Sequence, residues 1–145
     1  MTLTIFVLLL IAHFLGDVVF SFPRLFIAKR SDDFFKRLAG LFSHAVIHGL
    51  FTCLLLLFSG SLWIKGSLLV LAVHFIIDFV RTGIEIRLFG SGDIYVKRSE
   101  FTAWVSGKYK SPGKMNIKNL WPWILINLFD QSAHVGSLYF IARIM

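Results

Sequence analysis

The sequence has few charged residues and almost no cysteine. Of its 145 residues, 16% are charged and one, Cys53, is a cysteine. No internal disulfide can therefore form, and cysteine usage does not identify a redox compartment. The chain also lacks paired zinc-binding cysteines, a serine-centred elbow, a phosphate-binding loop and a dinucleotide-binding fingerprint. These absences exclude the zinc, hydrolase and nucleotide sites that are recognised from local motifs.

Apolar residues are abundant. They make up 57% of the chain, phenylalanine occurs 16 times, and the mean hydropathy is +0.76. A soluble domain is typically about 45–50% apolar, so the excess must face something other than water. The net charge of +7 does not indicate a nucleic-acid partner, because the basic residues lie between apolar blocks rather than on one polar face. We expect a lipid bilayer as the partner.

Four apolar blocks predict an all-α fold, an integral membrane four-helix bundle with a polar core. A membrane-spanning helix needs about 20 apolar residues. One transmembrane domain is expected over residues 1–145, with spans of about 3–22, 38–58, 63–81 and 120–141. The links 23–37 and 82–119 join spans one to two and three to four. Within the first link, Ser31 is a candidate cap for the helix that follows.

The positions of Lys and Arg predict the orientation. Link 23–37 carries five, and the segment from Arg81 to Lys118 carries eight. The remaining two are Lys65 and Arg143. Because basic residues accumulate in cytoplasmic links, both long links are predicted to be cytoplasmic and both termini to lie outside. The basic links either set this topology alone or also hold anionic lipid head groups.

Each predicted span carries two ionisable residues spaced four positions apart. They are His13 and Asp17, His44 and His48, His74 and Asp78, and Asp130 and His134. This spacing places both members of a pair on one helix face. All five histidines belong to these pairs, and the other five acidic residues fall in the links. Helices of alternating direction would bring the pairs to a similar depth in the membrane.

The cost of burying these groups indicates a site. One aspartate at mid-membrane costs about 2.5–3.5 kcal/mol, and such groups persist only when they are neutralised, paired or facing a polar cavity. A divalent metal provides that compensation through neutral imidazole and carboxylate ligands. Zinc is the expected metal, and the number of candidates suffices for one or two ions. The predicted ligands are His13, His44, His48, His74, Asp78, Asp130 and His134.

Two further residues have predicted catalytic roles. Asp17 is expected to orient a histidine or to act as a general base. Gln131 is expected to donate a hydrogen bond to a developing oxyanion, or simply to form an interhelical hydrogen bond.

At these same residues the sequence resembles the bacterial and phage membrane-protein family known as domain of unknown function 3307. The stretches that carry the resemblance are Ala12 to Asp17, Ser43-His44 with His48, His74 to Asp78, and Asp130 to His134. The resemblance implies a small multi-span protein and, with it, a bacterial cytoplasmic membrane. It implies no reaction.

Three functions remain as alternatives. The first is a metal-dependent hydrolase that acts within the membrane on a lipid or lipid-linked substrate, through a metal-bound hydroxide. The second is a proton or metal-ion transport component, since chains of Asp and His also conduct protons. The third is a non-enzymatic subunit, in a homo-oligomer or a larger membrane complex, where the polar pairs hold helices together.

Overall fold

The computed structural model describes residues 2–20, 22–58, 62–90, 103–108 and 117–145, and most of the predicted link 82–119 lies outside them. The all-α prediction is confirmed for these residues, none of which forms a strand. The elements are α1 (Thr2–Phe14), the π-helical turn η1 (Leu15–Val19), α2 (Pro23–Lys29), α3 (Phe34–Leu57), α4 (Trp63–Phe89) and α6 (Ile117–Ile144).

Three helical segments are long and apolar enough to cross a membrane. They are Thr2–Val19, Phe34–Leu57 and Trp63–Phe89, of 18, 24 and 27 residues. Large apolar side chains cover their outer faces; Leu50, for example, is 64% exposed. A soluble protein rarely exposes so much contiguous apolar surface, so the chain has the character of a membrane protein. That α6 forms a fourth span, and the bacterial cytoplasmic membrane as location, stay predictions.

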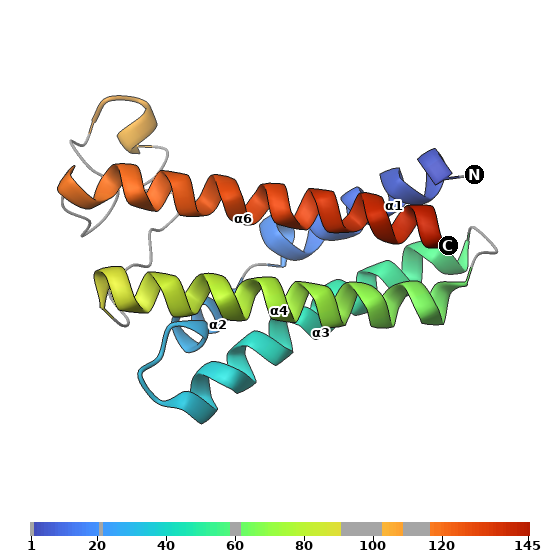
Figure 1. The fold of residues 1–145 in the computed structure, drawn as a ribbon, viewed down its shortest axis with the longest axis horizontal. Helices are drawn as coiled ribbons and strands as arrows, with labels where there is room; N and C mark the ends of the chain where they lie inside the picture. The colour runs from blue at the N-terminus through green and yellow to red at the C-terminus, as the bar shows by residue number, and fades with distance from the viewer. Residues whose placement is uncertain (1, 21, 59–61, 91–102, 109–116) are drawn as a thin grey trace.

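The long helices run side by side around one interior (Figure 1). Helix α1 contacts α3 and α6, and α4 also contacts α3 and α6. The start of α1 and the end of α6 lie at the same end of the molecule (Figure 1). The short helix α2 packs against α3, so the first link folds back onto the helices.

The interior is divided along the helix axes. Its apolar core comprises Ile5, Leu9, Leu56, Val70, Leu138, Ile141 and Ala142. These positions all lie in the half of each helix nearest the two termini. Apart from Thr52, the buried polar residues lie from about the middle of the helices onwards, towards α2 and the end of α4. The predicted outer side of the protein is therefore closed by hydrocarbon, and the polar interior lies towards the predicted cytoplasmic side.

Two helix ends differ from the sequence-based expectation. Asp33, not Ser31, caps α3, because its Oδ1 accepts a hydrogen bond from the Lys36 backbone N–H at 3.0 Å. Helix α4 continues eight residues beyond the predicted span end at Arg81 and stops at Gly90, whose φ of +83° favours glycine. Glu85, assigned from sequence to a link, is fully buried in this extension.

Candidate metal centre

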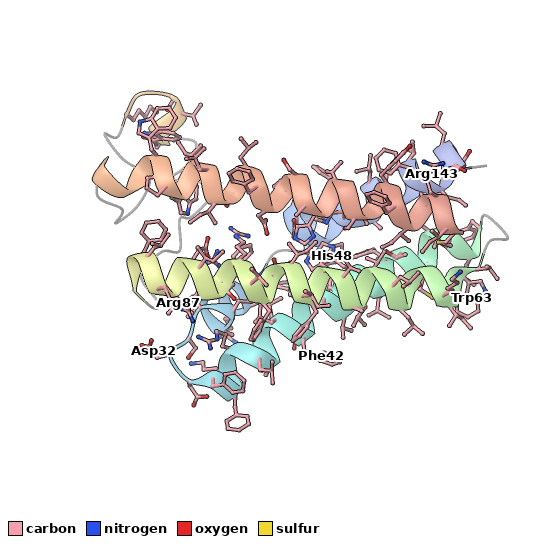
Figure 2. The ribbon with its side chains drawn as sticks, in the orientation of Figure 1. Asp32, Phe42, His48, Trp63, Arg87 and Arg143 are labelled. Carbon is pink, nitrogen blue, oxygen red and sulfur yellow. The ribbon has the colours of Figure 1, made fainter. Side chains whose placement is uncertain are left out.

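The predicted pairs converge in the interior. Seven of the eight residues are buried, and the Asp17 side chain is 24% exposed. The five imidazole rings form one continuous group, with centroids of neighbouring rings 3.6–5.6 Å apart. His48 lies between the helices, whereas Phe42 on the same helix points outwards (Figure 2). The spacing of four positions within each pair thus predicted correctly that these side chains lie together.

Within this cluster, three overlapping sets of side chains bring potential ligand atoms within 4.8 Å of one another. The sets are Asp17/His44/His48/His74, His13/His74/His134 and Asp78/Asp130/His134. Every predicted ligand therefore belongs to at least one set, and Asp17 belongs to the largest. The chemistry of the donors suits a divalent transition metal, because all are imidazole nitrogens or carboxylate oxygens.

Asp17 joins the two sides of the cluster through its two oxygens. Its Oδ1 lies 3.1 Å from His44 Nε2 and 3.2 Å from His48 Nε2. Ligand atoms around tetrahedral zinc lie about 3.3–3.4 Å apart, given bond lengths of about 2.0–2.1 Å. Its Oδ2 lies 3.4 Å from His13 Nε2 and 3.5 Å from Gln131 Nε2. Oδ1 thus lies at the distance expected between two ligands of one zinc ion. Oδ2 is held in place by His13 and Gln131.

Several histidine nitrogens have no hydrogen-bond partner among the described residues. They include Nε2 of His48 and Nε2 of His74, both fully buried. The two rings are stacked, with centroids 3.6 Å apart and planes 22° from parallel. A buried polar atom without a partner costs about 1–3 kcal/mol. A metal bound by both nitrogens would remove that cost and explain why the rings are held together.

A π-helical turn places Asp17. The turn is closed by a hydrogen bond from the Phe20 N–H to the Leu15 carbonyl, five residues earlier, at 2.9 Å. Such single turns occur frequently at functional sites. Gly16 lies in the turn, and an added Cβ there would come within 2.5 Å of the His48 ring. Only glycine lets α1 approach α3 closely enough for Asp17 to reach two histidines.

The other two aspartates of the cluster are already paired with cations. Lys29 Nζ donates a 2.7 Å hydrogen bond to Asp78 Oδ2. Arg81 Nη1 donates to Asp130 Oδ2 at 3.2 Å, and Arg81 Nη2 lies 3.2 Å from Glu85 Oε1. Burial lowers the pKa of Lys29 from its usual 10.5, and the Asp78 carboxylate opposes that change. Among the described residues, no Lys or Arg forms an ion pair with Asp17.

Sequence reasoning missed four charged residues next to the cluster. They are Lys29, Arg30, Arg81 and Glu85. Arg30 Nε donates to Glu85 Oε2 at 2.8 Å, and Arg30 is 4% exposed. The basic residues of the links were predicted from the sequence to set the topology or to hold lipid head groups, whereas Lys29 and Arg30 are buried in the interior. One signal was present: positions 74, 78, 81 and 85 continue a single helical face beyond the predicted span.

Gln131 contacts the cluster from α6. Its Oε1 lies 3.4 Å from His13 Nε2, and its Nε2 donates to Asp130 Oδ2 at 3.1 Å. The contact with His13 joins α6 to α1, which is the interhelical role considered from sequence. The oxyanion role stays a prediction.

A helical membrane protein with a buried cluster of histidine and aspartate is the class that fold and site define. The match to known families agrees. Residues 5–145 match the family described as a protein of unknown function, DUF3307, and the chain belongs to that family. The comparisons found no matching curated protein and no matching solved structure.

Proposed function

We propose that this protein binds one divalent metal ion, with zinc as the first candidate, through His44, His48, His74 and Asp17. The observation that carries the proposal is the Asp17 carboxylate. It lies at ligand-to-ligand spacing from His44 and His48, and no Lys or Arg of the described chain pairs with it. The neighbouring Nε2 of His74 is buried without a hydrogen-bond partner. This set supplies three imidazoles and one carboxylate, a donor set that suits zinc.

The carboxylate-rich set is a weaker candidate for the metal. Asp78 and Asp130 are each neutralised by a hydrogen-bonded cation. A divalent ion at that set would have to displace Lys29 or Arg81, or would lie beside it at high electrostatic cost. Asp17 offers its charge without such competition. We therefore assign Asp78, Asp130, His13 and His134 to positioning the metal ligands rather than to binding the metal.

The chemistry that we propose is hydrolysis of an ester or phosphoester bond in a lipid or lipid-linked substrate. With four protein ligands, a bound zinc would take a water as a fifth ligand, lower the pKa of that water and polarise a carbonyl or phosphoryl oxygen. The water oxygen would bond to that centre, and the alcohol leaving group would depart with the proton. Asp17 is the most exposed member of the ligand set, so water and substrate would reach the metal beside it. In this proposal Asp17 therefore binds the metal, in place of the general-base role predicted from the sequence.

The division of the interior favours hydrolysis over transport. A transported ion would have to pass the apolar layer formed by Ile5, Leu9, Leu56 and their neighbours. That layer would be a barrier to a charged species, whereas a reaction with access from the predicted cytoplasmic side does not need to cross it. A metal-dependent ion flux in liposomes would reverse this preference.

The first experiment measures metal content by elemental analysis. The full chain is purified in detergent without a metal-binding tag, together with His48→Ala and His134→Ala. We expect about one metal per chain in the parent, none in H48A and retention in H134A. H134A is a matched control because His134 is also a buried imidazole whose ring stacks on His74.

Two other outcomes would contradict the proposed metal site. Loss of metal in H134A but not in H48A would move the site to one of the two sets that contain His134. A folded parent that stays free of metal after reloading with zinc, manganese and iron would reject the proposal. If the metal is present, ester and phosphoester lipids are then screened for hydrolysis that depends on it.

A further inference from the structure

A groove runs between α4 and α6 and ends at the cluster. It has a volume of about 410 Å³, within the range of ligand-binding pockets. Its apolar walls are Ile76, Ile77, Val80, Ile84, Ile126, Phe129 and Ala133. In both helices these positions run from the level of the histidines towards the predicted cytoplasmic end. The walls therefore match an extended hydrocarbon chain lying along the helices.

Two polar residues, Arg81 and Asp130, line the groove. Asp130 connects it to the cluster, because its Oδ1 lies 3.5 Å from His134 Nε2. Arg81 Nη1 donates to Asp130 Oδ2, Nη2 donates to Asn127 Oδ1 at 2.7 Å, and the side chain is still 13% exposed. A partly exposed guanidinium beside an apolar wall suits a ligand that has both a hydrocarbon chain and an anionic oxygen.

The charges of the buried region also favour an anion. It holds four carboxylates, on Asp17, Asp78, Glu85 and Asp130. It holds three cations, on Lys29, Arg30 and Arg81. These charges leave at most one negative charge among the described residues, so a divalent metal makes the region positive. In an apolar surrounding an unpaired positive charge is costly, and a singly negative group would balance it.

We infer that the groove between α4 and α6 binds an acyl chain of a membrane lipid whose phosphodiester head group carries one net negative charge and lies against Arg81. The inference rests on the proposed function for its charge balance and extends it by naming the substrate class. The acyl chain lies along the isoleucines, and the head group is held beside Asp130, which Gln131 Nε2 connects to Asp17 through contacts of 3.1 and 3.5 Å.

The test is native mass spectrometry of the full chain with three defined lipids of equal acyl composition. They are dioleoyl phosphatidylglycerol, dioleoyl phosphatidylcholine and dioleoylglycerol. We expect phosphatidylglycerol to bind about fivefold more tightly than the other two, because one additional charge interaction contributes on that order. Chelation of the metal should remove this preference. Glycerophosphate, which has no acyl chain, should not compete.

Two matched tryptophan variants locate the binding. Ala133 lines the groove, so Ala133→Trp should fill it and lower phosphatidylglycerol binding about tenfold. Val135 lies two residues further on α6, is 41% exposed and does not line the groove. Val135→Trp should leave binding unchanged. Both variants should keep the metal content of the parent, which shows that they fold.

The outcomes separate this inference from the proposed function. Equal binding of all three lipids, insensitive to A133W, would show ordinary bilayer lipid and overturn the inference while the metal site stands. A dimer abolished by A133W but not by V135W would assign the groove to a second copy of the chain and also overturn it. Absence of metal with selective, A133W-sensitive binding would reject both the metal and the charge balance based on it, and would assign the selectivity to Arg81 alone.

Discussion

Lys29 Nζ lies 2.7 Å from Asp78 Oδ2, and both side chains are almost completely buried. The contact joins the short helix α2 to the middle of α4, 49 positions away in the sequence. Gly40 on α3 permits it, because an added Cβ there would come within 2.8 Å of the Lys29 backbone nitrogen. The first link is thus part of the interior and supplies one of its charges.

Lys29→Met should destabilise the protein by about 3–5 kcal/mol, because it leaves the Asp78 carboxylate buried without its cation. Denaturant unfolding in detergent, followed by tryptophan fluorescence, measures the effect. Lys36→Met removes an exposed lysine of the same link and should change stability by less than about 0.5 kcal/mol. The double variant K29M/D78N should recover part of the loss. Equal stability of K29M and the parent would contradict the buried pair.

Gly16→Ala should reduce metal content, because its Cβ would displace the His48 ring. Gly83→Ala is the control: an added Cβ at Gly83 meets nothing within 4 Å, so this variant should keep its metal and gain about 0.5–1 kcal/mol of helix stability. Elemental analysis and thermal unfolding of both variants make the comparison. Full metal occupancy in G16A would show that His48 is free to move without loss of the site.

Metal removal should lower the melting temperature. A ligand at about 1,000 times its Kd stabilises the folded state by about 4.1 kcal/mol, and a chelator removes that contribution. Zinc added back should restore it. In His48→Ala the chelator should have no effect, since no metal is bound at the start. A chelator effect of equal size in both proteins would place the metal elsewhere.

Thiol labelling tests the predicted orientation. In a Cys53→Ser background, Lys65→Cys should react with a membrane-impermeant reagent in intact cells. Lys36→Cys should react only after the membrane is permeabilised. Both lysines are exposed, so access is set by the side of the membrane rather than by burial. The reverse pattern would invert the topology, and with it the side from which the groove is reached.

The sequence predicted the cluster well because helical geometry is local. The spacing of His74 and Asp78, or of Asp130 and His134, fixes a common helix face without knowledge of the fold. The long apolar segments predicted four spans in the same way, and three of the four correspond to helical segments that are long and apolar enough to cross a membrane. That the four pairs meet follows from the cost of leaving any one of them in lipid.

The charged residues around the cluster were harder to predict because their partners are distant in sequence. Basic residues between spans ordinarily indicate topology, and nothing local distinguishes Lys29 from Lys36. Only the packing of α2 on α3 buries the first and leaves the second exposed. Glu85 was assigned to a link because apolar composition ended at Arg81, although the helix did not.

The π-helical turn of residues 15–19 has a consequence for how the chain tolerates a deletion. The turn closes between residues five apart, one more than in an α-helix. Loss of one residue after Asp17 would let it close as an ordinary α-helical turn, and the segment leading to Pro23 would keep its direction. The same loss between His44 and His48, in the regular helix α3, would rotate one histidine by about 100° relative to the other.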